Sequence, residues 1–187
     1  AVATPVEEAQ VLIQQGDLEG ALKRLDRYLS GSPQDAEARF TRGLVLVRLT
    51  RTKEAIKVFS DLTRDYPQLP EPYNNLAVLY ASQGQYEKAR QSLEQSIRTH
   101  PAYATAYENL GDVYTKLASQ AYDKALQLDS SNTTAQTKLA LVRDLVPSGS
   151  KPTKPSASAP AVAKAAEPAK PAPTVLAQAS TPPAKPA

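Results

Sequence analysis

The sequence contains no cysteine, no methionine and no tryptophan, and only one histidine among its 187 residues. Without cysteine, the chain can form neither a disulfide nor a thiolate metal site, and it cannot use a cysteine nucleophile. It also has no apolar run near the roughly 18 residues that a membrane-spanning helix needs. These absences argue against a disulfide scaffold, a cysteine-ligated metal protein and a membrane span within this sequence.

Catalytic motifs are equally scarce. His100 stands beside Pro101 in an expected turn, and the sequence pattern brings no base or second metal ligand to it. The chain has no glycine-rich phosphate loop, no zinc-ligand spacing and no nucleophile elbow. We therefore expect a non-enzymatic protein without a cofactor and without a metal site.

The net charge of +3 is concentrated at the C-terminal end. Between Pro147 and Ala187 lie five lysines and one glutamate, together with ten prolines and twelve alanines. Residues 1–146 therefore carry a net charge of about −1, and the basic balance indicates no nucleic-acid-binding face on them. We expect the low-complexity segment 147–187 to be disordered. It would act as a tether or, alternatively, as an envelope spacer or a proline-rich ligand.

A period of about 34 residues organises the rest of the chain. The prolines at 33, 67 and 101 keep this interval, and so do the alanines at 21, 55 and 89. Within each period, apolar residues follow helical spacing in two segments. The expected turns between those segments lie at Gly16-Asp17, at 49–52 and at Gly84-Gln85. A fixed period of this length is typical of stacked helix pairs.

These periods resemble the tetratricopeptide repeat family. The third carries the family's pattern of large and small residues at Tyr73, Leu76, Ala77, Tyr80, Gly84, Tyr86, Ala89, Leu93 and Pro101. The second supplies Gly43, Leu46, Ala55, Phe59 and Pro67, and the first supplies Ala9, Leu12, Gly16, Ala21, Leu25 and Pro33. The resemblance implies an all-α fold, a right-handed superhelical α-solenoid of helix pairs. We expect full repeats at about 2–35, 36–69 and 70–103, a shortened fourth at about 104–132, and a capping helix at 133–146.

The fourth repeat is too short. The stretch ALQLD at 125–129 comes five residues early, and the missing piece is the turn between the two helices. Apolar residues keep helical spacing through the gap, at Leu110, Tyr114, Leu117, Ala121, Ala125 and Leu128. We expect one continuous helix from about Thr105 to Leu128. The alternative is a tight turn at Ala118-Ser119, with Ser119 as the cap.

A continuous helix cannot fold its second half back over its first half. Apolar surface would then stay uncovered unless a second chain covers it, which is the geometry of a domain swap. The residues expected to associate in such a homodimer are Leu117, Ala121, Ala125 and Leu128.

The family resemblance also implies where a partner protein binds. Extended peptides or helices of partners bind the concave face formed by the first helix of each pair. Register places on this face Gln10, Gln14, Phe40, Leu44, Val47, Arg48, Asn74, Asn75, Val78, Glu108, Asn109 and Asp112. The asparagines could hydrogen-bond a partner's backbone. For Phe40 and Leu44, packing against the neighbouring helix is an equal alternative, and for Glu108 and Asp112 a solvated helix face is the alternative.

Two functions fit these patterns. The first is a protein-binding scaffold of the bacterial cell envelope, similar to periplasmic proteins with these repeats, and the second is a self-assembling module that forms homodimers. The sequence starts at Ala1 without methionine, which is compatible with removal of a leader. We therefore expect a periplasmic protein, with a cytoplasmic one as the alternative.

Overall fold

The computed structural model describes residues 1–146, which form eight α-helices and no strand. The helices are α1 (Pro5–Gln14), α2 (Leu18–Gly31), α3 (Ala36–Arg48), α4 (Thr52–Asp65), α5 (Pro70–Ser82), α6 (Tyr86–Thr99), α7 (Ala104–Leu128) and α8 (Thr133–Leu145). The segment 147–187, for which we predict disorder, lies outside the described residues.

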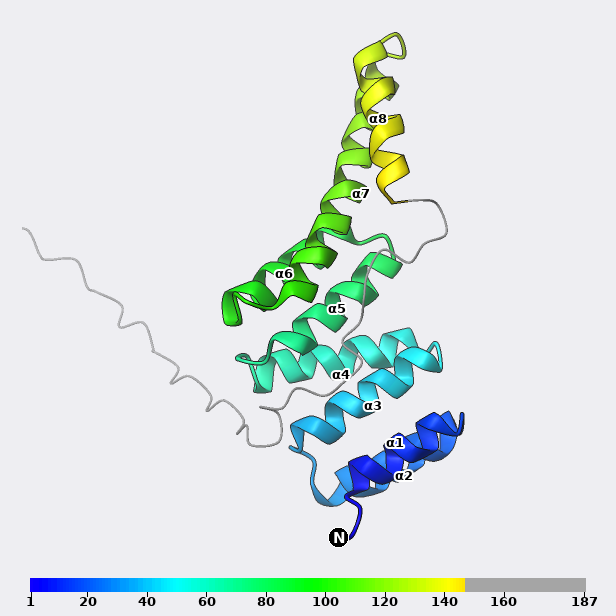
Figure 1. The fold of residues 1–187 in the computed structure, drawn as a ribbon, viewed down its shortest axis with the longest axis vertical. Coiled ribbons are helices and arrows are strands. Elements are labelled where there is room, and N and C mark those ends of the chain that lie inside the picture. The colour runs from blue at the N-terminus through cyan, green and yellow to red at the C-terminus, as the bar shows by residue number, and fades with distance from the viewer. Residues whose placement is uncertain (147–187) are drawn as a thin grey trace, which may run out of the picture.

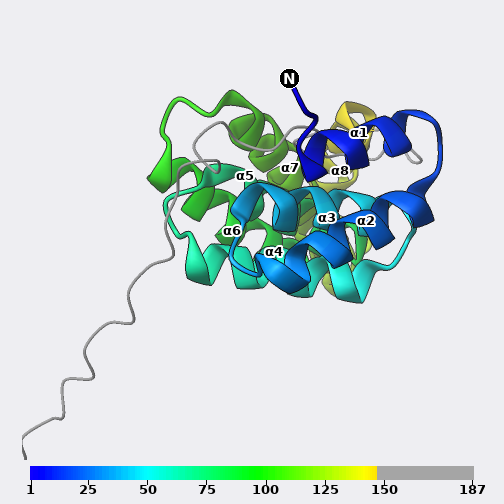
Figure 2. The ribbon, with the colours of Figure 1, turned by 90° about the horizontal axis from the view of Figure 1, so that it is seen from below.

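The helices form a stack of pairs along the long axis of the molecule (Figure 1). Odd-numbered helices contact each other at two places along the stack, α1 with α3 and α5 with α7. Among the described helices, the even-numbered ones show no comparable contacts with each other. Viewed along the stack, α1 and α7 lie toward one side and α4 toward the other (Figure 2). The expected α-solenoid is therefore confirmed.

The same turn joins the two helices of each of the first three pairs. Gly16, Thr50 and Gly84 stand one period apart and adopt left-handed φ angles of 81°, 58° and 74°. In the third turn, the Gln85 backbone N–H donates to the Tyr80 carbonyl at 2.9 Å, and the other two turns have the equivalent bond. This Schellman pattern closes the end of the first helix. Glycine reaches the required φ without steric cost. For Thr50 the same left-handed φ is sterically unfavourable, because threonine carries a branched side chain.

A second turn joins one pair to the next. Pro33, Pro67 and Pro101 each occupy the second position of a turn, and Ser130 takes that position in the fourth. The residue before and the residue two places after are bonded through the backbone, as from Tyr103 N–H to His100 O at 3.0 Å. Proline suits the second position of such turns because its φ is already fixed near the required value.

The fourth pair has lost its first kind of turn. α7 runs for 25 residues without a break, and Ala118 and Ser119 lie inside it. The expected continuous helix is confirmed, and the alternative turn at Ala118-Ser119 is wrong. The physical reason is the missing glycine turn, because the residues around position 118 are good helix formers with no chain-reversing residue among them. α8 then returns alongside the second half of α7 (Figure 1).

The hydrophobic core has two parts. One cluster joins α1 to α5, and the other joins α5, α6 and the first half of α7. Ala135 and Leu139 of α8 are buried but belong to neither cluster. The hairpin of α8 and residues 118–128 therefore packs on its own side chains and lies outside both core clusters.

Candidate partner-binding face

The predicted binding residues divide into a buried and an accessible group. Four are buried, with exposures of 0–2%: Phe40, Asn74, Asn75 and Asn109. Their placement on an open face was wrong, because neighbouring helices of the stack pack closely enough to enclose them. For Phe40 the packing alternative holds, since its ring meets Phe59 edge to face with centroids 5.5 Å apart.

The asparagines hold the stack together from within. The Asn109 amide donates to the Asn74 side-chain oxygen at 2.8 Å, joining α7 to α5, and the Asn74 amide lies 3.4 Å from the Asn75 side-chain oxygen. Two of the amides that we predicted to bond a partner's backbone, Asn74 and Asn109, are thus paired with each other between neighbouring helices. Buried amides need such partners because an unpaired one would cost about 1–3 kcal/mol.

The accessible group forms rows along the odd-numbered helices. Gln10, Leu44, Val78 and Asp112 share one register position, each one period after the last, and Gln14 and Arg48 share another. Gln10, Gln14, Arg48 and Glu108 are exposed, while Leu44, Val47, Val78 and Asp112 are half-buried. We call these eight residues the inner rows. Their side chains are amides on α1, apolar or cationic on α3, and acidic on α7.

Glu71, in the first turn of α5, is the most unusual carboxylate of the described chain. Its Oε2 is buried and has no hydrogen-bond partner within residues 1–146. Burial raises the pKa of the Glu71 carboxyl, against smaller opposing effects of a backbone N–H and of His100. At pH values between the ordinary pKa of this carboxyl and its raised pKa, Glu71 is protonated in the folded chain but ionised in the unfolded chain. Folding stability must therefore fall as pH rises through that window.

Replacing Glu71 with glutamine should remove this cost. At neutral pH we expect Glu71→Gln to unfold at a higher temperature than the parent chain, and below pH 4.5, the ordinary pKa of the side chain, the difference should disappear. Thermal unfolding followed by circular dichroism at both pH values measures it. Glu19→Gln, an exposed first-turn glutamate of α2, is the matched control. Equal shifts for both variants would contradict the role of burial.

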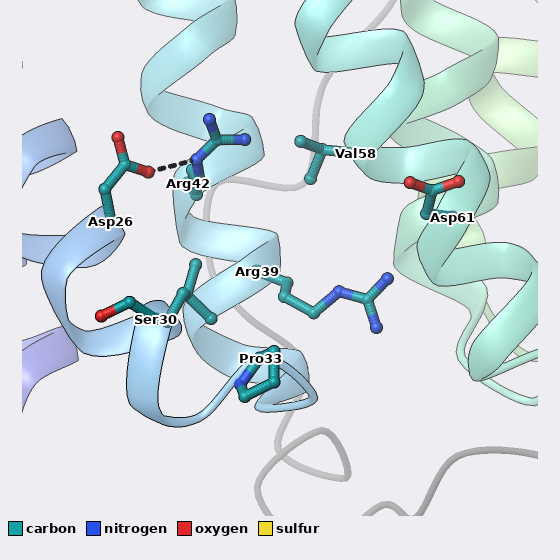
Figure 3. Close-up of a pocket in the computed structure, with 8 residues that line it drawn as sticks. Asp26, Ser30, Pro33, Arg39, Arg42, Val58 and Asp61 are labelled. Carbon is teal, nitrogen blue, oxygen red and sulfur yellow. Dashed lines mark hydrogen bonds and ion pairs between the residues drawn. The ribbon is translucent and has the colours of Figure 1, made fainter.

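Sequence reasoning missed a cavity of about 350 Å³ on the even-numbered side, between α2, α3 and α4. Arg42 reaches from α3 to Asp26 of α2, with Nε 2.6 Å from Oδ1 (Figure 3). Arg39 of the same helix points toward α4 (Figure 3), where its guanidinium lies 2.8 Å from Asp65 Oδ2. Both arginines thus form ion pairs with carboxylates of the chain itself, and these ion pairs connect α3 to α2 and to α4.

The next unit has a cavity at the equivalent place, but different side chains line it. A cavity of about 480 Å³ is lined by Tyr73, Leu76 and Tyr80, with α4 and α6 on its other sides. Tyr73 and Leu76 stand one period after Arg39 and Arg42. The only signal that could have revealed these hollows is the repeat register itself, which gives the positions but not the empty space.

We call the even-numbered helix of each pair its outer helix and the odd-numbered one its inner helix. On α7 the equivalent residues have no outer helix of their own unit beside them, although the Tyr114 hydroxyl reaches Glu94 Oε1 of α6, the outer helix of the preceding unit, at 3.5 Å. Tyr107 and Tyr114 are 50% and 48% exposed, and Leu128 is 79% exposed. Of the residues predicted to self-associate, Ala121 and Leu128 are exposed and Ala125 is half-buried. Leu117 is also half-buried, since it packs against the second core cluster.

Neither a metal cluster nor a membrane span occurs in the described part of the chain. From residue 1 to residue 146, no three histidine or acidic side chains gather around a possible metal position. None of the helices there is both long enough and apolar enough to cross a bilayer.

Comparison with known proteins agrees with the repeat pattern. Two tetratricopeptide repeat models match residues 6–70 and 58–91, and a further TPR repeat model matches 79–117. Among solved structures, MamA from Desulfovibrio magneticus RS-1 is similar, with a TM-score of 0.57 and 23% identity over 78% of this chain and 87% of that one. A thermophilic TPR protein of Thermus thermophilus gives a TM-score of 0.55 and 23% identity, with 75% and 80% covered.

Two of the curated relatives are longer proteins. The chloroplastic tetratricopeptide repeat domain-containing protein PYG7 of Arabidopsis thaliana is 28% identical, over 73% of this chain and 48% of its own length. The human protein O-mannosyl-transferase TMTC3 is 30% identical over 70% of this chain and 16% of its own. This chain thus spans half or less of these relatives. The matched repeat models together run from residue 6 to residue 117, more than half of the sequence, and the chain belongs to the tetratricopeptide repeat family.

Proposed function

We propose that this chain is a non-enzymatic scaffold that binds a peptide or helix of a partner protein along the inner rows, in the assembly of a bacterial cell-envelope complex. Proteins built from these repeats are generally interaction scaffolds, and the matched family supports that class. The observation that carries the proposal is the alignment of accessible residues in rows. Because the row of Gln10, Leu44, Val78 and Asp112 takes one residue from each of four units, an elongated partner can contact several units at once.

The chemistry of the inner rows suggests what such a partner carries. Leu44, Val47 and Val78 provide an apolar middle, and Glu108 and Asp112 provide an acidic end on α7. A segment with apolar side chains followed by lysine or arginine would satisfy both parts. The apolar contacts would supply most of the affinity, and the charges would fix the direction of the segment.

Substitution in the apolar middle tests the proposal. Leu44→Gln gives the second unit the residue that the first unit already has at this register position, Gln10. We expect affinity for a partner, identified by cross-linking in the native cell, to fall about tenfold, as loss of one apolar contact implies. Isothermal titration with the purified partner measures it.

Ile56→Gln is the matched control. Ile56 and Leu44 are both half-buried against the same core cluster, but Ile56 lies on the even-numbered helix α4. This variant should keep the parent affinity while losing a similar amount of stability. Equal affinity of both variants for the partner would overturn binding along the inner rows.

Location in the periplasm is part of the proposal and rests on the composition. A cysteine-free chain needs no protection from an oxidising compartment. Fractionation of the native cell, with an antibody against this chain, tests the compartment. Recovery with the cytoplasm would overturn the envelope assignment and leave the scaffold proposal standing.

Self-assembly is a second candidate function, and the unbroken α7 favours it. In the first three pairs the outer helix covers its inner helix, but α7 leaves its own first half uncovered on that side, as the exposed Tyr107 and Tyr114 indicate. A homodimer that covers this surface could exist alongside partner binding, because the inner rows of α1, α3 and α5 lie on other helices.

A further inference from the structure

The uncovered side of α7 has a slot where its sister helices are filled. Gly43, Ala77 and Gly111 share one register position in three successive periods. A Cβ atom added to Gly43 would lie 2.6 Å from Phe59 Cζ of the outer helix, and Ala77 is fully buried. A Cβ added to Gly111 would meet nothing within 4 Å. α7 therefore keeps the small residue that admits an outer helix, but no outer helix of its own chain is there.

The second half of α7 has the sequence of that missing outer helix. Ala118, Tyr122 and Leu126 repeat the spacing of Ala89, Leu93 and Ile97 on α6. They come five positions earlier than a full period after those residues would place them. The stretch without a counterpart is Gly84–Lys88, which contains the left-handed glycine of the turn. The sequence of residues 118–128 thus has the pattern of an outer helix, but in the structure these residues continue the inner helix α7.

Side-chain sizes match across this register. The small residue of each inner helix and the large residue of each outer helix form the pairs Ala9 and Leu25, Gly43 and Phe59, and Ala77 and Leu93. All of these except Gly43, which is also buried, have 0% exposure. Where the inner helix has alanine, the outer helix has leucine, and where the inner helix has glycine, the outer helix has the larger phenylalanine, so the combined side-chain volume stays similar. By the same rule, Gly111 suits an aromatic residue, and the residue at the outer position of the fourth unit is Tyr122.

One helix cannot make this pair with itself. Gly111 and Tyr122 are eleven positions apart on α7, which is about 16 Å along its axis. α8 occupies a different side of residues 118–128, since Arg143 of α8 pairs with Asp123 at 3.1 Å. Ala121 consequently remains exposed, although Ser92 at the same register position on α6 is 9% exposed.

The free surface runs the whole length of α7. Its members are spaced by four and three residues alternately and none is buried: Tyr107, Gly111, Tyr114, Ala118, Ala121, Ala125 and Leu128. A seven-residue apolar repeat of this kind is the pattern by which two helices pack along each other. The stripe is therefore suited to a second long helix and not to a short outer helix alone.

We propose that two copies of this chain pair antiparallel through α7, so that residues 118–128 of each copy supply the missing outer helix of the other. This inference rests on the self-assembly proposed above. Inner and outer helices of one unit run antiparallel, and two α7 helices related by a two-fold axis do the same. Placing Gly111 opposite the second copy's Tyr122 automatically places Tyr122 opposite the second copy's Gly111. The contact is isologous and closes as a dimer.

Restoring the missing turn is the sharpest test. A copy of Gly84–Lys88 inserted between Leu117 and Ala118 of the full chain would let residues 118–128 fold back onto their own α7. We expect the parent chain to sediment as a dimer and the insertion variant to associate about 100-fold more weakly, because two symmetry-related contacts are lost together. Analytical ultracentrifugation over a range of concentrations measures both.

Two further variants keep the test independent of that insertion. Gly111→Leu fills the slot while meeting open space in the single chain. It should therefore weaken the dimer without lowering the unfolding temperature measured at concentrations where the parent chain is monomeric. Gly31→Leu, also in open space on a helix, should leave the dimer intact. In the cysteine-free chain, Gly111→Cys with Tyr122→Cys should give covalent dimers with a bismaleimide shorter than the span between the two positions, which cannot join them within one helix.

The outcomes separate the two proposals. A parent chain that stays monomeric at all concentrations would overturn both self-assembly and this interface. A dimer that persists in the insertion variant and in Gly111→Leu, and gives no cross-link through the paired cysteines, would overturn the α7 interface alone.

Discussion

Replacement of Phe59 with alanine is expected to lower the free energy of unfolding by about 3–5 kcal/mol. The Phe59 side chain has 0% exposure, and its ring meets that of Phe40 at an interplanar angle of 69°. The tip of the ring also fills the space over Gly43, which has no side chain to occupy it. Truncation would therefore leave a cavity between both helices of the second unit and remove the aromatic contact.

Urea unfolding followed by far-UV circular dichroism measures this loss. Val58→Ala is the matched control, since Val58 is the preceding residue on α4 and is only half-buried. That change should cost about 1 kcal/mol, the usual size for a partly exposed site. Similar losses for the two variants would show that the second unit is not organised around Phe59.

The repeat register could be predicted from the sequence because single residues fix its turns. Proline at 33, 67 and 101 and glycine at 16 and 84 each impose a backbone conformation that few other residues accept so readily. The unbroken α7 follows from the same logic, since removing the residues that impose a turn leaves only helix formers. Local chemistry was sufficient for these elements.

The binding face could be predicted less well, because burial depends on how closely neighbouring helices approach. Asn74 and Asn109 are polar and lie at register positions of the inner helices, so the pattern alone favours exposure. In the structure they bond to each other at 2.8 Å and are fully buried. Sequence spacing identifies the helix face but not the partner that compensates a buried amide. The half-burial of Leu117 also depends on tertiary packing, since the second core cluster extends along α7 as far as this residue.

The pair of Gly43 and Phe59 provides a second large effect, measured as a coupling between two substitutions. Gly43→Ala would place a Cβ 2.6 Å from Phe59 Cζ, and such overpacking should cost about 1–3 kcal/mol before the better helix propensity of alanine offsets up to about 1 kcal/mol. Phe59→Leu alone should also destabilise the chain, because leucine leaves part of the ring's volume empty.

The double variant Gly43→Ala with Phe59→Leu should be more stable than the sum of the two single losses predicts, by about 1–3 kcal/mol. It recreates the alanine and leucine pair that the first and third units already contain at Ala9 with Leu25 and Ala77 with Leu93. Urea unfolding of the parent, both single variants and the double variant completes the cycle. If the two losses of unfolding free energy simply add, the sizes of the residues at positions 43 and 59 are not energetically coupled. That result would also remove the size rule that assigns Tyr122 of one copy to Gly111 of another.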